Sequence, residues 1–288
     1  MAGILNDVAQ LGDELATSLS LEAAKVIDRP TEAFRAAFAE AKVVALDAEG
    51  VDLSRKGEIS IVQIATPKQC FLVDVLGKSK TDPLVVALRK VLEDADVVKI
   101  IHDCRMDADA MYHHLGIALT NVHDTSCWHN KLSVYGANKS LNDTLRAYGI
   151  PPNVQRDCSI YRRNPRFWAE RPLTSTMIEW ASGDVESLFT LYDRQRAQAK
   201  ERKATSAELG IDGLTADFLS WKSATVSFIT VGNPGRFIGR GGCNIHSTER
   251  RTNTIIYKAP HSVANGRRNV FMVYHRDSAA LEAVERAA

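Results

Sequence analysis

The segment 43–50, VVALDAEG, constrains the fold more than any other stretch of the chain. A continuous apolar run of this length predicts a buried strand in a sheet that is covered on both faces. The run ends in Asp47 and Glu49, and the period-two geometry of a strand sends both side chains to the same side. Two carboxylates in a partly dry place repel each other unless a cation such as Mg²⁺ lies between them. The alternative is that one acid caps a loop while the other is solvated.

The pattern that surrounds this strand predicts an α/β domain with a mixed sheet. Residues 25–42 indicate a short strand, a turn at Pro30 and a helix capped by Thr31. Apolar runs and alternation predict further strands at 58–66, 70–75 and 97–103. Helical spacing of apolar residues predicts helices at 83–94, 105–116, 140–149 and 175–203, the second of them closed by Gly116.

The chain divides into four parts. Residues 1–24 have helical spacing and indicate an N-terminal helical extension, and the α/β domain covers 25–203. Residues 204–219 are small, polar and punctuated by glycine, which indicates a linker. Residues 220–288 predict a separate small α+β domain, with strands at 223–230, 254–259 and 268–275 and helices at 243–252 and 277–288.

Composition and charge narrow the class of protein. Of the 288 residues, 45% are hydrophobic and 25% charged, as in a soluble globular protein. The first residues carry acids and no basic region, so we expect no secretory signal. The five cysteines are odd in number and form no CxxC pair, which predicts a reduced cytoplasmic or nuclear protein. The part from Trp221 onward has ten Lys or Arg and four Asp or Glu, which suits a phosphate-binding surface or an ordinary basic face.

Three more acids are candidates for the site that contains Asp47 and Glu49. Asp107 and Asp109 lie in the first turns of the helix predicted at 105–116, and Asp184 lies in the helix predicted at 175–203. Side chains two residues apart on a helix point in different directions, so at most one of Asp107 and Asp109 joins a shared site. The sequence thus offers acids from three separate segments for one cluster.

Three motifs in order resemble the RNase D-like branch of the DEDD 3′–5′ exonucleases over roughly residues 25–200. They are LDAEGVDLSRKGEISIVQIAT, VVKIIHDCRMDADAMYHHLGI and FWAERPLTSTMIEWASGDV. The resemblance implies a ribonuclease-H-like fold and two-metal hydrolysis that removes nucleotides from the 3′ end. It implies that two Mg²⁺ or Mn²⁺ ions are held by Asp47, Glu49, Asp107 and Asp184. Asp109 is expected to be a solvated neighbour.

The resemblance makes Trp180 an unusual residue. Members of this branch usually carry a tyrosine there, one helical turn before the last acid, and its hydroxyl orients the attacking water. An indole nitrogen only donates a hydrogen bond, whereas a phenol also accepts one. Three interpretations stay open: a slow exonuclease that relies on its metals, an indole that fixes water or stacks on a base, and a catalytically inactive RNA-binding adaptor.

The glycine-rich stretch FIGRGGCNIHSTERRTNTII resembles the phosphate-binding loop of a type I KH domain. The resemblance implies that Gly239, Arg240, Gly241 and Gly242 clamp a nucleic-acid backbone, with Ile238 and Ile245 lining the groove under the bases. Glycine allows close approach to phosphates, and a helix N-terminus offers N–H groups to them. The expected partner is single-stranded RNA, with single-stranded DNA as the alternative.

Overall fold

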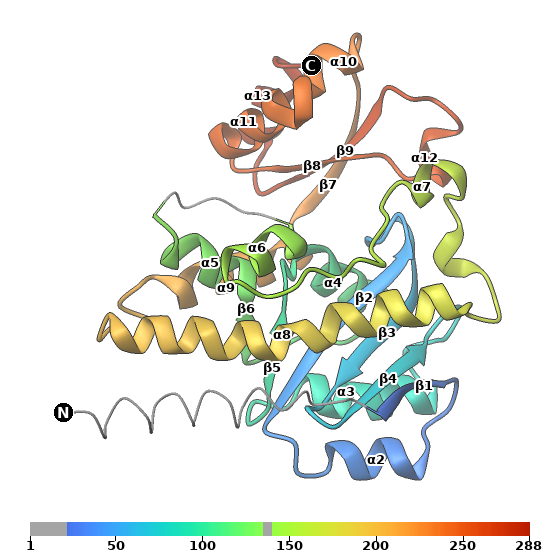
Figure 1. The fold of residues 1–288 in the computed structure, drawn as a ribbon. Coiled ribbons are helices and arrows are strands. Elements are labelled where there is room, and N and C mark those ends of the chain that lie inside the picture. The colour runs from blue at the N-terminus through green and yellow to red at the C-terminus, as the bar shows by residue number, and fades with distance from the viewer. Residues whose placement is uncertain (1–21, 135–139) are drawn as a thin grey trace.

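A computed structural model describes residues 22–134 and 140–288. The larger sheet is mixed, with its strands in the order β1-β4-β3-β2-β5-β6 (Figure 1). Its strands are β1 (Glu22–Ile27), β2 (Val43–Val51), β3 (Glu58–Ala65), β4 (Gln69–Asp74), β5 (Val98–Ile101) and β6 (Val122–Asp124). Strand β2 runs antiparallel to β3 and parallel to β5. The predicted α/β class with a mixed sheet is confirmed.

Helices cover both faces of this sheet. They are α2 (Glu32–Phe38), α3 (Pro83–Leu92), α4 (Arg105–Ala110), α5 (Thr125–Leu132), α6 (Leu141–Ala147), α7 (Ile160–Arg163), α8 (Ser175–Glu201) and α9 (Ile211–Ser220). Helix α4 continues as the π-helical turn η1 (Met111–Leu115) and ends at Gly116, whose φ is +65°. Short 3₁₀ turns form η2 (Phe167–Ala169) and η3 (Trp221–Ser223). None of the helices within the two described ranges is long and apolar enough to cross a membrane.

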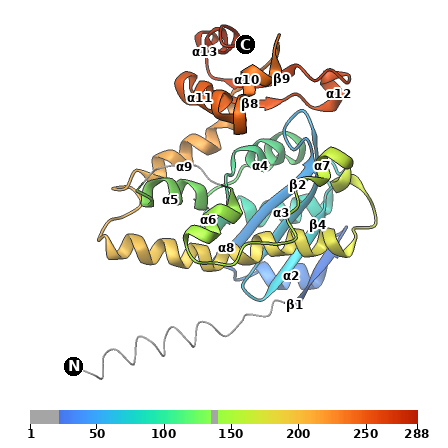
Figure 2. The same cartoon turned by 45° about the horizontal axis from the view of Figure 1, so that its top comes forward.

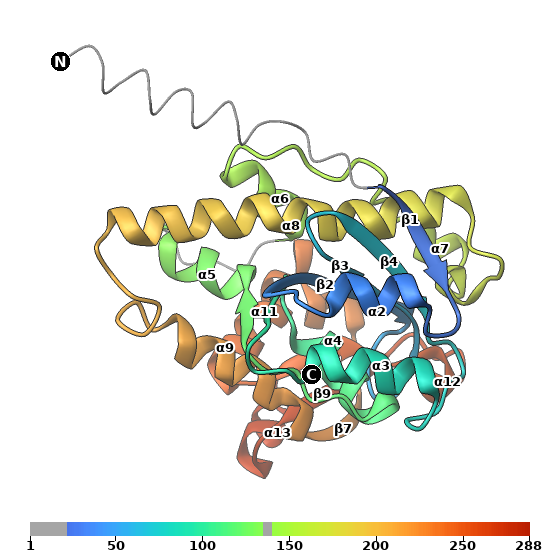
Figure 3. The same ribbon diagram turned by 90° about the horizontal axis from the view of Figure 1, so that it is seen from below.

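Alternation along β2 separates two hydrophobic cores. Val44, Leu46 and Ala48 pack in a core with residues of α2, α3 and α4. Ala45 belongs to the opposite core, where α6 and α8 supply most of the helical residues. Figure 3 shows the sheet between α8 on one side and α3 on the other. Because successive side chains alternate, Asp47 and Glu49 face the same side as Ala45, which is the side of α8.

Two predicted boundaries change. Residues 1–21 of the expected helical extension lie outside the described residues, and residues 22–24 belong to β1. The interpretation of 204–219 as a linker is wrong, because α9 occupies Ile211–Ser220, contacts α4 and α5, and buries Ile211 and Phe218 in the core. Apolar residues at 211, 214 and 218 have helical spacing, a signal that the small polar residues before them obscured.

The remaining residues form a smaller antiparallel sheet in the order β7-β9-β8, with helices packed on it. Its elements are β7 (Thr225–Thr230), α10 (Pro234–Ile238), η4 (Arg240–Gly242), α11 (Cys243–Thr252), β8 (Ile255–Lys258), α12 (His261–Ala264), β9 (Val270–His275) and α13 (Ser278–Glu285). Asp277 caps α13 as expected, since its side chain accepts a hydrogen bond from the Ala280 N–H. The strands and helices predicted for this part of the chain are therefore present in the predicted order, and the structure adds the short helix α12 between β8 and β9.

A buried ionic contact joins the two sheets. The Arg55 guanidinium forms a salt bridge with Asp109 at 2.6 Å and donates to the carbonyls of Trp221, Lys222 and Ala224. Asp109 also accepts hydrogen bonds from the Arg55 N–H and from the Tyr274 hydroxyl. The expectation that Asp109 is solvated is wrong, because packing of the smaller domain beside α4 buries it completely (Figure 2).

Candidate functional site

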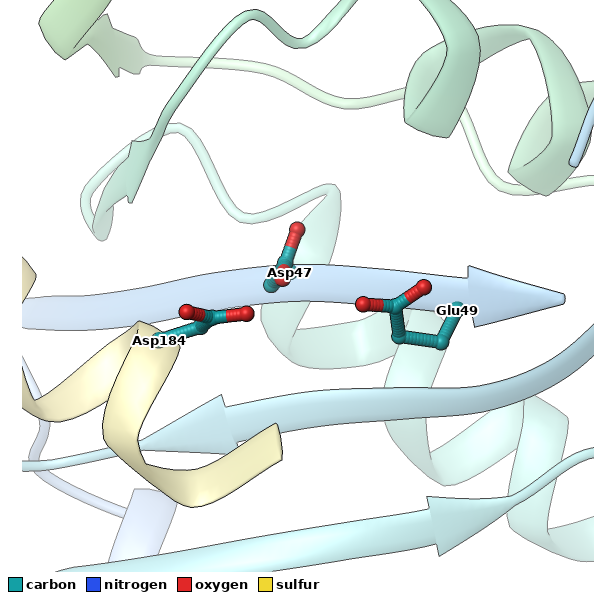
Figure 4. A group of neighbouring side chains, drawn as sticks. All are labelled: Asp47, Glu49 and Asp184. Carbon is teal, nitrogen blue, oxygen red and sulfur yellow. The ribbon is translucent and has the colours of Figure 1, made fainter. Parts of the chain in front are cut away.

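Three carboxylates meet where β2 passes α8. Asp47 and Glu49 project from β2, and Asp184 reaches toward them from α8 (Figure 4). One oxygen from each carboxylate lies within 4.8 Å of the other two. Strand alternation places the first two acids on the face that α8 covers, and the buried stripe of α8 turns Asp184 toward them. Acids from two of the three segments predicted from the sequence, the strand β2 and the helix α8, therefore lie together in one cluster.

Asp107 approaches the same strand from its other side. Its Oδ1 accepts a hydrogen bond of 3.0 Å from the N–H of Ala48, which lies between the two acids of β2. That N–H is available because β5 pairs with β2 only at Val43–Ala45, and α4 follows directly after β5. Asp107 is not part of the group of three, but the charge of Asp47 acts on it. The structure therefore brings the fourth predicted acid beside the cluster, with one oxygen engaged by the backbone.

The side chain of Trp180 is hydrogen-bonded to Asp184. Its indole N–H donates to Oδ2 of Asp184 at 3.0 Å, as one helical turn of separation allows. The side chain is 1% exposed and lies edge-to-face against Trp168 at 5.4 Å. Stacking on a substrate base, one of the roles considered for Trp180, does not fit this buried position. The indole fixes the orientation of the carboxylate.

Arg156 and Asn153 also contact Asp184, and our reading of the sequence missed both. Arg156 Nη1 donates to Oδ2 of Asp184 at 2.5 Å, and Asn153 Nδ2 donates to Oδ1 at 2.9 Å. Both residues lie in the irregular segment between α6 and α7, where periodicity carries no signal. The one available hint was a basic residue in a loop that precedes the acid-bearing helix by about twenty residues.

The acids influence one another's protonation. Burial, with the charge of Asp184 second, raises the pKa of Asp47 to about 7. Burial and the charge of Asp47 raise the pKa of Glu49 and of Asp107 above their usual ranges. Burial also raises the pKa of Asp184, although Arg156 and the other hydrogen-bond donors oppose this change. A positive charge placed among carboxylates with raised pKa values stabilises their ionised forms.

The donor set suits a hard divalent cation. Carboxylate oxygens are the ligands that Mg²⁺ and Mn²⁺ prefer. Gln63, which faces Asp47 across the β2–β3 pair, is fully buried, and neither polar atom of its amide has a partner among the described residues. A buried amide of this kind requires a hydrogen-bonding group such as an ordered water. The residues around Asp47 therefore fit a hydrated cation.

The glycine-rich stretch forms the junction of α10 and α11. Gly239, Gly241 and Gly242 all have positive φ, at +75°, +57° and +80°. Arg240 and Ile238 are exposed, whereas Ile245 is 8% exposed and packs in the core of the smaller sheet. Of the two isoleucines expected to line a groove, only Ile238 presents an open apolar surface.

A family model described as 3′–5′ exonuclease matches residues 27–198, which contain all four acids. The chain belongs to the 3′–5′ exonuclease family. The mouse protein described as "piRNA biogenesis protein EXD1" is 37% identical over an alignment of 183 residues that covers 58% of this chain and 32% of that protein. The chain thus spans about a third of the length of this curated relative.

Two solved structures show the fold of this exonuclease domain. RNase D of Trypanosoma brucei in complex with RNA U12 aligns with a TM-score of 0.58 and 23% identity, over 76% of this chain and 75% of that one. Escherichia coli RNase D, described as an exoribonuclease involved in structured RNA processing, aligns with a TM-score of 0.56 and 20% identity, over 71% of this chain and 52% of that one. The predicted RNase D-like fold of the larger domain is confirmed.

Proposed function

We propose that this protein is a divalent-metal-dependent 3′–5′ exonuclease that acts on single-stranded nucleic acid, with RNA as the principal substrate. The observation that carries the proposal is the meeting of Asp47, Glu49 and Asp184, from two elements of a 3′–5′ exonuclease domain, within 4.8 Å. A largely buried group of acids is costly for a fold, because the charge of each carboxylate opposes ionisation of its neighbours. A bound cation would offset this cost by neutralising the repulsion between the carboxylates.

Each acid has a place in the proposed site. Asp47, Glu49 and Asp184 would hold the ions, together with the oxygen of Asp107 that is not bonded to Ala48. Bound Mg²⁺ or Mn²⁺ ions supply an activated water and stabilise the leaving oxygen of a phosphodiester.

The protein's own contribution is orientation. Trp180 and Asn153 hold the Asp184 carboxylate toward β2, and the Ala48 N–H holds Asp107. With Trp180 in place of the expected tyrosine, no phenol is available at this position to accept a proton from the attacking water. Loss of such an orienting group commonly reduces a rate by about 10²–10⁴-fold, so we expect a slow enzyme.

We further propose that the smaller domain is a KH module that grips the substrate. Its support is the order β7-α10-α11-β8-β9-α13, with the four-residue helix α12 inserted between β8 and β9, and the three glycines with positive φ that precede α11. The backbone at Gly241 is open, since an added Cβ would meet no atom within 4 Å. Exposed Arg240 adds a positive charge beside the N-terminus of a ten-residue helix.

A second candidate function is an RNA-binding adaptor whose exonuclease domain does not cut. The contacts of Asp184 favour it, because Arg156, Trp180 and Asn153 already donate to this carboxylate. The retention of all four acids favours the enzyme.

The two functions are separated by incubating 5′-labelled single-stranded RNA and DNA with the purified protein and Mg²⁺, Mn²⁺ or a chelator. An exonuclease shortens the RNA one nucleotide at a time with metal, and both the chelator and Asp47→Asn stop the reaction. Intact RNA under every condition, together with degradation by Trp180→Tyr, would identify a domain disabled by its indole. Intact RNA with both proteins rejects the nuclease proposal.

The KH proposal is tested by the double change of Arg240 and Gly241 to Asp, which adds no steric clash at Gly241. A matched control changes Gly266 and Arg267 to Asp, because Gly266 also has positive φ and open space. We expect the first variant to lose single-stranded RNA binding in a filter or anisotropy assay, and the control to bind nearly as the parent does. Equal affinities for the two variants would reject the assignment of the loop.

A further inference from the structure

Arg156 has no role in the exonuclease function proposed above. Its side chain is 30% exposed and lies in the irregular segment between α6 and α7. Within the described ranges, Asp184 is the only hydrogen-bond partner of its guanidinium. Although burial acts in the opposite direction, the charges of Asp184, Asp47 and Glu49 raise the pKa of Arg156. The guanidinium therefore balances part of the negative charge of the cluster.

The hydrogen bonds to Asp184 limit what else this carboxylate can bind. Oδ2 accepts from Trp180 at 3.0 Å and from Arg156 at 2.5 Å, and Oδ1 accepts from Asn153 at 2.9 Å. A carboxylate oxygen has about two lone-pair sites. Both sites of Oδ2 are engaged, so a metal ion reaches this oxygen only if one donor leaves.

The three donors differ in how firmly they are held. Trp180 is buried among aromatic rings, and its departure would open the core under α8. Asn153 is tied to Asn142 by two hydrogen bonds of 2.9 and 3.0 Å, and it also donates to the carbonyl of Trp180. Arg156 has neither constraint. It is the donor that can leave without unfolding its surroundings.

We infer that Arg156 is a resident counter-ion of the acidic cluster, and that a divalent cation binds Oδ2 of Asp184 by displacing it. The inference rests on the proposed metal site and concerns how that site is filled. Metal binding and the position of the loop 151–159 are then linked, because one positive charge replaces another on the same oxygen. Conditions that hold the loop in place weaken metal affinity, and bound metal frees the guanidinium.

The test is a calorimetric titration of the full chain with Mn²⁺ alone, without RNA. Arg156→Gln removes the competing charge, and we expect it to bind Mn²⁺ about ten- to a hundredfold more tightly than the parent, the range that one charge-assisted hydrogen bond supplies. Arg163→Gln is the matched control, since Arg163 is 67% exposed and pairs with Asp157. Its Mn²⁺ affinity should equal that of the parent. Equal or weaker binding by Arg156→Gln would overturn the inference.

A second measurement uses the unaltered protein and does not depend on the folding of a variant. Arginine modification by phenylglyoxal, followed by peptide mass spectrometry, should become faster at Arg156 on addition of Mn²⁺ and stay constant at Arg163. Constant reactivity of Arg156 at saturating Mn²⁺ would overturn the displacement. Because neither measurement uses RNA, tighter Mn²⁺ binding by Arg156→Gln with no cleavage supports the inference and rejects only the nuclease function.

Discussion

The buried contact between the two sheets gives a sharp test of how they are held together. Asp109 has no exposed surface, and it binds the Arg55 side chain, the Arg55 N–H and the Tyr274 hydroxyl. Asp109→Ala removes the carboxylate that accepts from all three donors and leaves a guanidinium with only 12% of its side chain exposed. Breaking a buried pair by removing one partner costs about 3–5 kcal/mol.

We expect the lower end of this range. Arg55 keeps its hydrogen bonds to the carbonyls of Trp221, Lys222 and Ala224 in the variant, so the guanidinium is only partly without partners. The free energy of unfolding should therefore fall by about 3 kcal/mol. Tyr274→Phe removes one hydroxyl and should cost about 1–2 kcal/mol. Because both changes act on one carboxylate, their effects should not add.

Urea denaturation measures these free energies, and hydrogen exchange shows where stability is lost. In Asp109→Ala, the amides of 52–58 and of 221–225 should lose protection together, because Arg55 joins the two segments. Asp28→Ala changes an exposed acid and should stay within about 0.5 kcal/mol of the parent. A loss below about 1 kcal/mol in Asp109→Ala, or faster exchange confined to α4, would refute the reasoning.

Three other outcomes follow from single contacts. Trp180→Phe should lower the free energy of unfolding by about 2–4 kcal/mol, measured in urea, since it removes the N–H bonded to Asp184 and shrinks a buried ring. Burial lowers the pKa of His123 to about 4, so the unfolded chain binds a proton more readily than the folded protein and stability is lost as the pH falls from about 6.5 to 4. Relative to His123→Gln, the free energy of unfolding of the parent should fall by about 3 kcal/mol over that range. A difference between the two proteins that does not change with pH contradicts this prediction. Gly239→Ala should lower the melting temperature more than Gly241→Ala, because only the first Cβ meets side-chain atoms below 3.0 Å; equal shifts contradict it.

Local pattern predicted much of the framework. The apolar run of β2, the cap at Thr31 and the closing Gly116 are all where the sequence placed them. These features depend on period, on capping chemistry and on backbone φ, which neighbouring residues decide. The convergence of Asp47 and Glu49 with Asp184 was predicted from the resemblance of three ordered motifs to a family, and the structure brings these three carboxylates together.

The sequence by itself therefore determined most of the strands and helices, although β6, α5 and α9 were not predicted, and it determined that both acids of β2 lie on one side of the strand. Only the tertiary structure decided how each acid is used: Asp184 receives Arg156, Asp107 turns to the backbone of β2, and Asp109 is buried against the smaller domain. These contacts join residues 28, 59 and 165 positions apart. Their formation depends on the packing of whole elements, and no periodicity within a segment encodes that packing.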